Sequence, residues 1–370
     1  MLLSCALLFM VLMGGCGSTP APKQVALVFP PAPEPARFHY EMTLMSSAQV
    51  TTDAKKTRWS EWLTGESQGG EGFSKPFDVS TCKGVVYASD SVKRRVFAFD
   101  FPGKRFFMVG EDDPGALFKP LGLANDAACN LYVADASLRR VMVYDKDGKY
   151  IRAIGTPEMF HQLSHVASEP DGSRLYAVDT GGVSTTEHRI RVFDARSGAH
   201  LHDIATRGNA PGQLNLPRDI VLAPDGNLYV VDGGNFRVQV FKTDGTFVRT
   251  FGAIGARYGQ FSRPKGIAAD AAGNIYVADA AFGNFQIFNP QGELLLFIGE
   301  RSEKGGAAKY MLPAGIHVDE DGRVYFVDQY FRKIDVFRPA SLSGDQGFLA
   351  GAGGSGPPVA GPGASASEAK

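Results

Sequence analysis

Several familiar signals are missing from this 370-residue sequence. Its formal net charge is only −1, so no global field would attract nucleic acid or a membrane surface, and we expect no nucleic-acid partner. It has no glycine-rich phosphate loop and no GxSxG motif, so no standard enzyme motif is present. Long helical patterns are absent as well. Many short runs rich in Val, Tyr and Phe, each bounded by Gly, Asp, Asn or Pro, predict an all-β protein instead.

The N-terminal apolar run is too short to cross a bilayer. Leu2 to Met13 is apolar apart from Ser4, which is the length and character of a signal-peptide core. The sequence LMGGC that follows resembles a bacterial lipobox, although no Lys or Arg precedes the run and Met13 stands where leucine is usual. The resemblance implies a signal peptide over 1–16 and lipid attachment at Cys16.

The residues after the lipobox add to this expectation. In lipoproteins of Gram-negative bacteria, a glycine after the modified cysteine, here Gly17, implies the outer membrane. We therefore expect a protein of the bacterial cell envelope that is held on the outer membrane by its lipid anchor. An ordinary cleaved signal peptide and a misassigned start codon are the alternatives. Residues 17–36 are rich in proline and predict an extended tether, whereas 341–370 are rich in Gly, Ala, Ser and Pro and predict a disordered tail.

A run of apolar residues that ends in Asp recurs along the chain at intervals of 45, 44, 53, 47 and 49 residues. Each copy is followed by a second run, a turn such as KTDG, and a third run. Most copies then close with a Phe or Met shortly before a Pro that starts the next repeat. The six copies are VVYASD at Asp90, LYVAD at Asp135, LYAVD at Asp179, LYVVD at Asp232, IYVAD at Asp279 and VYFVD at Asp328.

Each repeat therefore holds four short strands, which could not bury both of their faces alone. Six such units arranged radially bury each sheet against its neighbours, as in a β-propeller. Residues 216–262 resemble NHL repeats, and the resemblance extends from about 75 to 338. It implies a six-bladed β-propeller of four-stranded antiparallel blades over 37–340. It does not imply one function, because NHL propellers include binding modules, sensor domains and a few lyases.

The sixth repeat stops at KIDVFRP after three strands, so an N-terminal segment must complete it. Strict alternation of apolar residues in RFHYEMTLM predicts a closing strand over 37–45. Trp59, Trp62 and Leu63 lie at helical spacing and predict a short helix over 57–65. We expect 37–66 to lock the ring.

A basic residue follows the repeated Asp, five positions later in most repeats. Catalysis needs a few unlike groups that converge on one point, whereas this pair is spread around a ring. We therefore expect a charge-assisted hydrogen bond that fixes the turn between the second and third strands. The predicted pairs are Asp90 and Arg95, Asp135 and Arg140, Asp179 and Arg189, Asp232 and Arg237, and Asp328 and Lys333, with Asn284 at the matching position of the fifth repeat.

The residues beside these pairs differ between repeats. In NHL-type propellers their turns share one rim with the loops that lead to the Pro. Exposed aromatics beside Arg are typical of protein-recognition surfaces, so this rim is a candidate for binding a protein partner. The alternative is ordinary loop chemistry, with the aromatics folded onto their own blades. The candidates are Arg94, Arg139, Arg218, Phe236, Lys265, Phe282, Tyr330, Phe331 and Arg332.

A metal site with catalytic chemistry is the alternative to a protein-binding rim. The NHL-like lyases hold zinc with one His from each of several blades, but the seven histidines here do not recur at one repeat position. Six-bladed lactonases hold an axial calcium with Glu, Asn and Asp. Two residues after the Pro, Asp78 and Asp219 lie in opposite blades, and His165 aligns with them. A divalent cation there would need six to eight oxygens if it were calcium. The alternative is that both aspartates cap turns or bind water, and no cofactor is then expected.

Cys82 and Cys129 lie at the turn between the first and second strands of adjacent repeats. A disulfide is an open alternative in an oxidising compartment, although Cys82 aligns two positions earlier than Cys129. These observations favour a non-catalytic scaffold of the cell envelope that binds a ligand or a protein. The alternative function is an envelope hydrolase or lyase, lactonase-like or amidating-lyase-like, with a metal in the axial channel.

Overall fold

The structure is a computed structural model that describes residues 27–51 and 70–350. The predicted signal peptide, Cys16 and the helix over 57–65 lie outside the described residues. Within those ranges, no helix has the length and apolar character needed to cross a bilayer. The short helix α1 (Ala48–Thr51) was not predicted.

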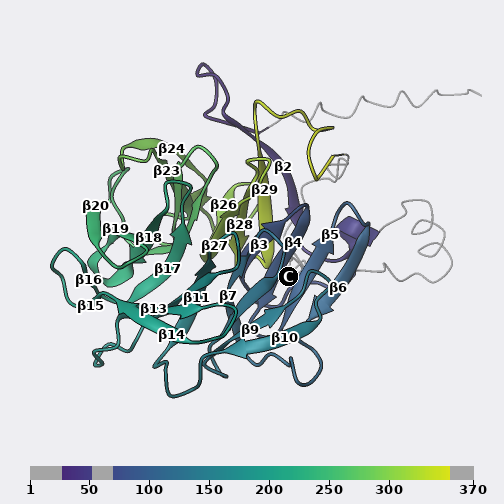
Figure 1. The fold of residues 1–370 in the computed structure, drawn as a ribbon. Coiled ribbons are helices and arrows are strands. Elements are labelled where there is room, and N and C mark those ends of the chain that lie inside the picture. The colour runs from purple at the N-terminus through teal and green to yellow at the C-terminus, as the bar shows by residue number, and fades with distance from the viewer. Residues whose placement is uncertain (1–26, 52–69, 351–370) are drawn as a thin grey trace, which may run out of the picture.

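Six antiparallel sheets are arranged around a central axis (Figure 1). The strands of blade 1 are β3 (Pro76–Cys82), β4 (Val85–Asp90), β5 (Arg95–Asp100) and β6 (Arg105–Val109); of blade 2, β7 (Pro120–Asn125), β8 (Leu131–Asp135), β9 (Arg140–Tyr144) and β10 (Tyr150–Ile154); of blade 3, β11 (Leu163–Ser168), β12 (Arg174–Asp179), β13 (Arg189–Asp194) and β14 (His200–Ile204). Those of blade 4 are β17 (Pro217–Leu222), β18 (Asn227–Asp232), β19 (Arg237–Lys242) and β20 (Phe247–Phe251); of blade 5, β21 (Pro264–Ala269), β22 (Ile275–Asp279), β23 (Asn284–Phe288) and β24 (Leu294–Ile298).

Blade 6 is completed by the N-terminal strand. It contains β27 (Pro313–Val318), β28 (Val324–Asp328) and β29 (Lys333–Pro339), and β2 (Phe38–Leu44) pairs antiparallel with β29. The predicted closing strand is therefore confirmed. A further strand, β1 (Val28–Phe29), pairs with β2 inside the segment predicted as a tether, so the end of that segment belongs to the sheet.

The core lies between the blades rather than at the axis. The first strand of each blade is innermost, and neighbouring inner strands contact one another around the ring. Six clusters of buried apolar side chains each join two adjacent blades; for example, Tyr87 and Ala98 of blade 1 pack with Val133 and Met142 of blade 2. This explains why these second strands are apolar up to their final Asp, since both of their faces are covered.

Four two-residue strands lie in the loops that precede the inner strands. They pair parallel in two couples, which lead into blades 4 and 6. These strands are β15 (Thr206–Arg207), β16 (Gln213–Leu214), β25 (Glu300–Arg301) and β26 (Lys309–Tyr310).

The C-terminal segment corrects one prediction. Disorder was expected from 341, but residues 341–350 are ordered against the propeller. Leu349 is 1% exposed and packs in the cluster between blades 6 and 1. The amide of Phe348 donates to Asp321 Oδ2 at 2.6 Å, and Arg323 Nη2 donates to the carbonyl of Gln346 at 2.9 Å. The composition of the segment did not predict this order. The order depends on one residue, Leu349, whose burial between two blades stabilises a segment that is otherwise rich in Gly.

A disulfide joins blades 1 and 2. Cys82 and Cys129 are bonded, with their Cα atoms 5.6 Å apart. Their unequal alignment does not prevent the bond, because β3 runs one residue longer than β7 and places Cys82 at its very end. The bond closes the inner-strand turns of two blades on one side of the ring.

Candidate functional site

The repeated Asp accepts hydrogen bonds from backbone amides in every blade, and in blades 1, 2 and 6 these replace the basic partner predicted for it. Asp135 is fully buried, and its Oδ2 accepts hydrogen bonds from the amides of Phe118 and Lys119 at 2.6 and 2.9 Å. Its Oδ1 accepts from the amides of Ser137 and Leu138, both at 2.9 Å. One carboxylate thus ties the loop before the inner strand to the turn between the second and third strands.

The other repeated aspartates use the same kinds of donor. The amide donors are those of Ser74, Lys75, Val92 and Lys93 to Asp90, of His161 and Gln162 to Asp179, of Asn215 to Asp232, of Ser262, Arg263, Ala281 and Phe282 to Asp279, and of Met311, Leu312 and Phe331 to Asp328.

The predicted ion pair exists at hydrogen-bond distance in blade 4, where Arg237 Nε lies 2.8 Å from Asp232 Oδ2. In blade 3 the corresponding atoms of Arg189 and Asp179 are 3.7 Å apart. The prediction is wrong for the other three pairs, because nearby amides already occupy the carboxylate oxygens. There the basic residues lie elsewhere: Arg95 pairs with Glu111, Lys333 with Asp335, and Arg140 has no side-chain hydrogen bond or ion pair in the described part of the chain.

We call one side of the ring the proline rim. It comprises the loops that lead into the six inner strands and the turns that follow the six repeated aspartates. The residue before each third strand has a left-handed backbone in five blades, with φ between 53° and 67°. These five turns therefore share one backbone conformation at this position, whereas the residue type at the position differs between blades. The residues are Arg94, Arg139, Phe236, Gly283 and Arg332.

The aromatic candidates of the proline rim are mostly folded onto their own blades. Phe236 packs against the core between blades 4 and 5, and Phe282 is half-buried. Phe331 is also half-buried and contacts Tyr330 edge-on, with ring centroids 5.0 Å apart. Tyr330 is 60% exposed. The expected aromatic surface is thus reduced to one exposed ring.

Unpaired cations gather on the same rim. Arg139 donates to the carbonyl of Phe160 at 3.3 Å, but most of the basic side chains here form no hydrogen bond or ion pair with any described residue. These unpaired side chains are Lys75, Arg94, Lys119, Arg140, Arg218, Arg263, Lys265 and Arg332. The proline rim therefore carries eight basic side chains that have no hydrogen-bond or ion-pair partner among the described residues.

The cations nearest the axis repel one another. Burial, together with the charges of Arg263 and Arg218, lowers the pKa of Lys265 to about 8. Burial and Arg263 also lower the pKa of Arg218. Arg218 lies over the blade 4 turn, where a Cβ at Gly233 would be 2.6 Å from its Cγ. Sequence reasoning missed Arg263 and Lys75, because it considered residues after the Pro and not those before it.

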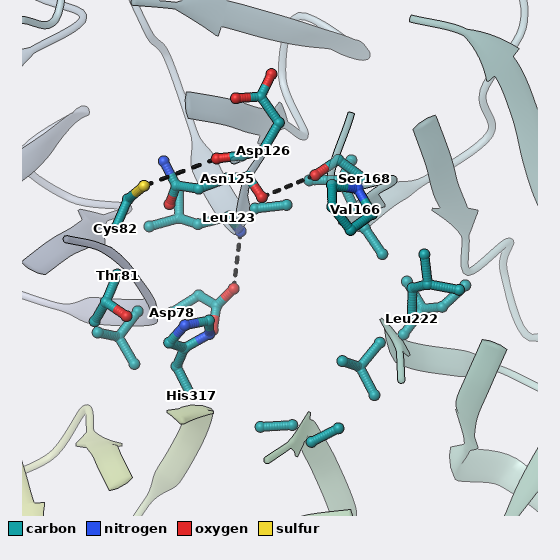
Figure 2. Close-up of a pocket in the computed structure, with 18 of the residues that line it drawn as sticks. Asp78, Thr81, Cys82, Leu123, Asn125, Asp126, Val166, Ser168, Leu222 and His317 are labelled. Atoms are coloured by element: carbon teal, nitrogen blue, oxygen red, sulfur yellow. Dashed lines mark hydrogen bonds between the residues drawn. The ribbon is translucent and has the colours of Figure 1, made fainter. Parts of the chain in front are cut away.

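The axial channel encloses about 600 Å³ and is lined by the inner strands (Figure 2). Asp78 and Asp219 are 4% and 5% exposed in its wall. Asp78 Oδ2 accepts from the amide of Leu123 in the next blade at 2.8 Å. Asp219 Oδ2 accepts from the amide of Ile267 in the next blade at 2.8 Å, and its Oδ1 accepts from its neighbour's amide at 2.7 Å. Each aspartate thus joins two blades.

Glycines make room for these side chains at the same repeat position. A Cβ at Gly315 would lie 2.2 Å from Oδ1 of Asp78, and a Cβ at Gly122 would lie 2.5 Å from Cα of His165. His165 is buried, its ring centroid is 5.4 Å from that of Phe77, and its Nδ1 has no hydrogen-bond partner. The inner strands thus carry either glycine or a larger polar residue at this position, because the larger side chains need the space beside a glycine to pack around the axis.

Over residues 27–51 and 70–350, no three His, Cys, Asp or Glu side chains are arranged to hold a metal ion. The axial cation that the sequence left as an alternative at Asp78, His165 and Asp219 gains no support from this geometry. Backbone amides instead donate to Asp78 Oδ2 and to both carboxylate oxygens of Asp219. Burial instead raises the pKa of both carboxyls to about 7; for Asp78, the charge of His165 opposes this rise and that of Asp219 adds to it.

These raised pKa values give a pH prediction. We expect the stability of an Asp78→Asn/Asp219→Asn variant, relative to wild type, to increase from about pH 5 to about pH 8. A carboxyl with a raised pKa in the folded state stabilises fully below about pH 4, and this contribution is lost as pH rises through about 7. Asparagine carries no such dependence. The slope would reach at most about 1.4 kcal/mol per pH unit for each carboxyl.

The measurement is urea unfolding of both proteins across that pH range. Burial lowers the pKa of His165 and of His317, which gives the opposite pH dependence. His317 drops out of the difference, because neither aspartate contributes to the shift of its pKa. His165 contributes to the difference, because the charge of Asp78 raises its pKa and is lost in the variant. A difference that stays constant from about pH 5 to about pH 8 would show that neither carboxyl is perturbed.

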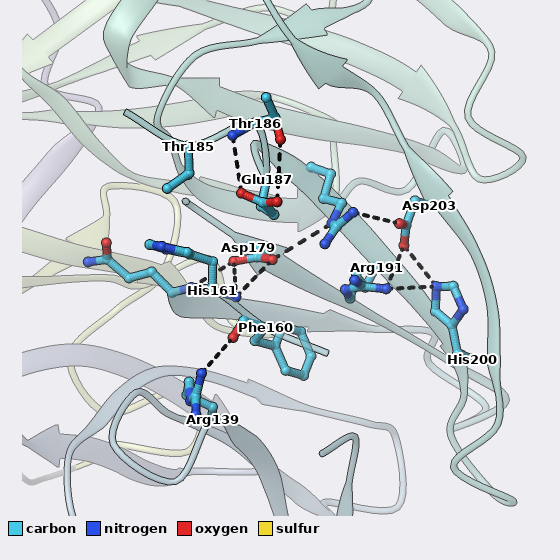
Figure 3. A network of polar contacts seen from close by, with 12 residues as sticks. Arg139, Phe160, His161, Asp179, Thr185, Thr186, Glu187, Arg191, His200 and Asp203 are labelled. Atoms are coloured by element: carbon cyan, nitrogen blue, oxygen red, sulfur yellow. Dashed lines mark hydrogen bonds and ion pairs between the residues drawn. The ribbon is translucent and has the colours of Figure 1, made fainter. Parts of the chain in front are cut away.

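Blade 3 holds a separate polar network at its outer strands (Figure 3). Arg189 and Arg191 both contact Asp203, at 3.4 and 3.3 Å, and His200 Nε2 lies 2.8 Å from the same carboxylate. The buried His188 accepts from the amide of Leu216 at Nδ1, at 3.1 Å. Two histidines of this blade, His188 and His200, are thus held by structural contacts.

The sequence comparisons agree with this architecture. The NHL repeat family matches residues 214–241 and 261–288, which lie in blades 4 and 5. Among curated proteins, the human NHL repeat-containing protein 3 is 25% identical over 178 residues, which cover 45% of this chain and 51% of that protein. The chain spans about half the length of this curated relative.

Solved structures share the fold. A Bacteroides thetaiotaomicron protein of unknown function has a TM-score of 0.59 and 18% identity, over 72% of this chain and 70% of that one. A gluconolactonase from Xanthomonas campestris has a TM-score of 0.55 and 16% identity, over 72% of this chain and 86% of that one. At these identities the likeness concerns the fold alone. The chain is a six-bladed β-propeller, and its residues 214–241 and 261–288 match NHL repeats.

Proposed function

We propose that this NHL-repeat propeller is a non-catalytic binding module of the bacterial cell envelope, which holds its ligand or protein partner on the proline rim. The observation that carries the proposal is the concentration of unpaired cations there. Side chains that stabilise a fold are usually partnered, whereas exposed Arg beside an exposed ring such as Tyr330 is typical of recognition surfaces.

The charge distribution supports this choice. The charges of Arg263 and Arg218 lower the pKa of Lys265, and the charge of Arg263 lowers that of Arg218. No described carboxylate forms an ion pair with these side chains. A binding partner with negative charge would offset this repulsion. The carboxylates of the axial channel, in contrast, already have amide partners, which is the arrangement of a structural element.

An affinity experiment tests the proposal. The full-length chain would be immobilised and exposed to solubilised envelopes of the source bacterium. We expect an Arg218→Ala/Lys265→Ala/Tyr330→Ala variant to lose a component that wild type retains. A matched variant, Lys104→Ala/Lys149→Ala, removes unpaired lysines from the opposite rim and should retain it. Identical capture by wild type and both variants would overturn the proposal.

The envelope location is part of the proposal and rests on the lipobox-like LMGGC sequence. With Cys16→Ser, the chain should move from the membrane fraction to the soluble fraction. Retention in the membrane fraction would show that the anchor lies elsewhere.

One observation favours a second candidate, a hydrolase or lyase that acts in the axial channel. Asp78 and Asp219 have pKa values raised to about 7 beside a cavity of about 600 Å³, and perturbed carboxyls in a cavity are common in acid–base sites. The Asp78→Asn/Asp219→Asn variant separates the two candidates. Loss of an enzymatic activity with unchanged capture on the proline rim would support the enzyme.

A further inference from the structure

The centre of the proline rim brings three cations together from two blades. Arg218 and Lys265 occupy the same register position, directly after the Pro that begins β17 and β21. These two inner strands are in contact. Arg263 lies on the other side of Pro264, two residues before Lys265. Lys75, in the loop before β3 of blade 1, is close enough to influence Lys265 as well.

No described carboxylate is free to neutralise this group. The acidic side chain whose charge acts on Lys265 is Asp328, but its oxygens accept the amides of Met311, Leu312 and Phe331. It forms no ion pair with the cluster. Lys265 is half-buried, whereas Arg218 and Arg263 are exposed. Their like charges repel one another, and this repulsion is strongest at Lys265, where burial reduces solvent screening.

The residues that share this register position differ in size around the ring. The neighbouring blade 6 has Ala314 there, whereas blade 1 has Phe77, whose ring centroid lies 5.4 Å from that of His165 in blade 3. Asp78 and Asp219 line the axial channel, whose further lining residues, such as Cys82 and Asp126, lie towards the opposite rim.

We propose that Arg218, Arg263 and Lys265 form a binding site for a multiply charged oxyanion of the phosphate type. The inference rests on the proposed function and names the chemistry that the proline rim recognises. A single carboxylate would leave most of the positive charge unmatched, whereas a phosphate or pyrophosphate group matches it. Arg is the side chain best suited to this, because its planar fork donates two parallel hydrogen bonds to phosphate oxygens.

Two sources can present this group: a free phosphate compound, or the headgroup of a phospholipid. Isothermal titration of the full-length chain distinguishes them. One arm uses inorganic pyrophosphate, and the other uses dihexanoyl phosphatidic acid below its micelle concentration, with dihexanoyl phosphatidylcholine as its control. Pyrophosphate binding identifies a free ligand, and binding of phosphatidic acid alone identifies a headgroup. Either result supports the site.

Variants show whether the binding occurs at these residues. We expect Arg218→Gln/Lys265→Gln to weaken binding by about tenfold or more, since it removes two charge-assisted contacts. The matched Lys104→Gln/Lys149→Gln variant removes the same charge from the opposite rim and should stay within about twofold of wild type. Arg218 and Lys265 are not core residues, and the thermal unfolding of both variants would verify that they fold.

The inference is overturned if neither probe binds, or if both variants bind as wild type does. Its failure differs from failure of the proposed function. If no oxyanion binds while the proline-rim variant still loses a captured envelope component, the rim recognises another chemistry and the binding module remains.

Discussion

Replacing Asp135 by alanine is expected to destabilise the propeller by about 3 kcal/mol or more, whereas Arg140→Ala should change its stability by less than about 0.5 kcal/mol. Asp135 is fully buried and accepts four backbone amides. Its removal leaves those donors unsatisfied, at about 1–3 kcal/mol for each one that stays buried. Arg140 is exposed and has no side-chain hydrogen bond or ion pair among the described residues.

Urea unfolding of the two single variants measures both effects. Asp135→Asn is the matched control: it keeps one carbonyl oxygen for two of the amides but turns an NH₂ group towards the other two. Its stability should fall between those of wild type and Asp135→Ala. Equal losses of unfolding free energy in Asp135→Ala and Arg140→Ala would show instead that an ion pair between the two residues fixes this turn.

Removal of residues 1–45 is expected to abolish the cooperative unfolding transition or to lower the Tm by well over about 10 °C. The truncation deletes β2, which is the outer strand of blade 6 and buries Phe38 and Leu44. It also removes Glu41, whose Oε2 lies 2.8 Å from Nε of the fully buried Arg323. Loss of one partner of a buried ion pair alone costs about 3–5 kcal/mol.

Removal of residues 1–26 provides the control, because these residues precede β1 and β2. Differential scanning calorimetry should give this shorter deletion nearly the Tm of the full chain. A single Glu41→Gln substitution isolates the buried pair and should cost part of the same stability. If the chain without residues 1–45 melted like the full chain, the N-terminal strand would not close the ring.

The fold could be predicted because the pattern of each strand is local. The second strands end in Asp at regular intervals, and RFHYEMTLM alternates strictly, so both the blades and the closing strand are visible in the sequence. The order of residues 341–350 was not visible, since it depends on Leu349 filling a gap between blades that are distant in sequence. Composition describes a segment but not the cavity that receives it.

The candidate site could be predicted only in part. The residue types at the axis were identified, but the partners of Asp78 and Asp219 are backbone amides of the next blade, which no side-chain pattern reveals. The same reason explains the error at Asp135, where four amides replace the expected Arg140. Arg263 was missed because the Pro was taken as the start of the site. The cluster forms only when two adjacent inner strands bring the residues on both sides of that Pro together.

A crystal structure of the full-length chain soaked in inorganic pyrophosphate would locate the ligand directly. We predict pyrophosphate density at the centre of the proline rim, within hydrogen-bond distance of Arg218 and Lys265. We also predict that the oxygens of Asp78 and Asp219 remain bonded to the amides of the next blade. The opposite result would be a ligand or cation bound to these two carboxylates inside the channel, with no ligand at Arg218 and Lys265. That result would contradict a binding module that works through its proline rim.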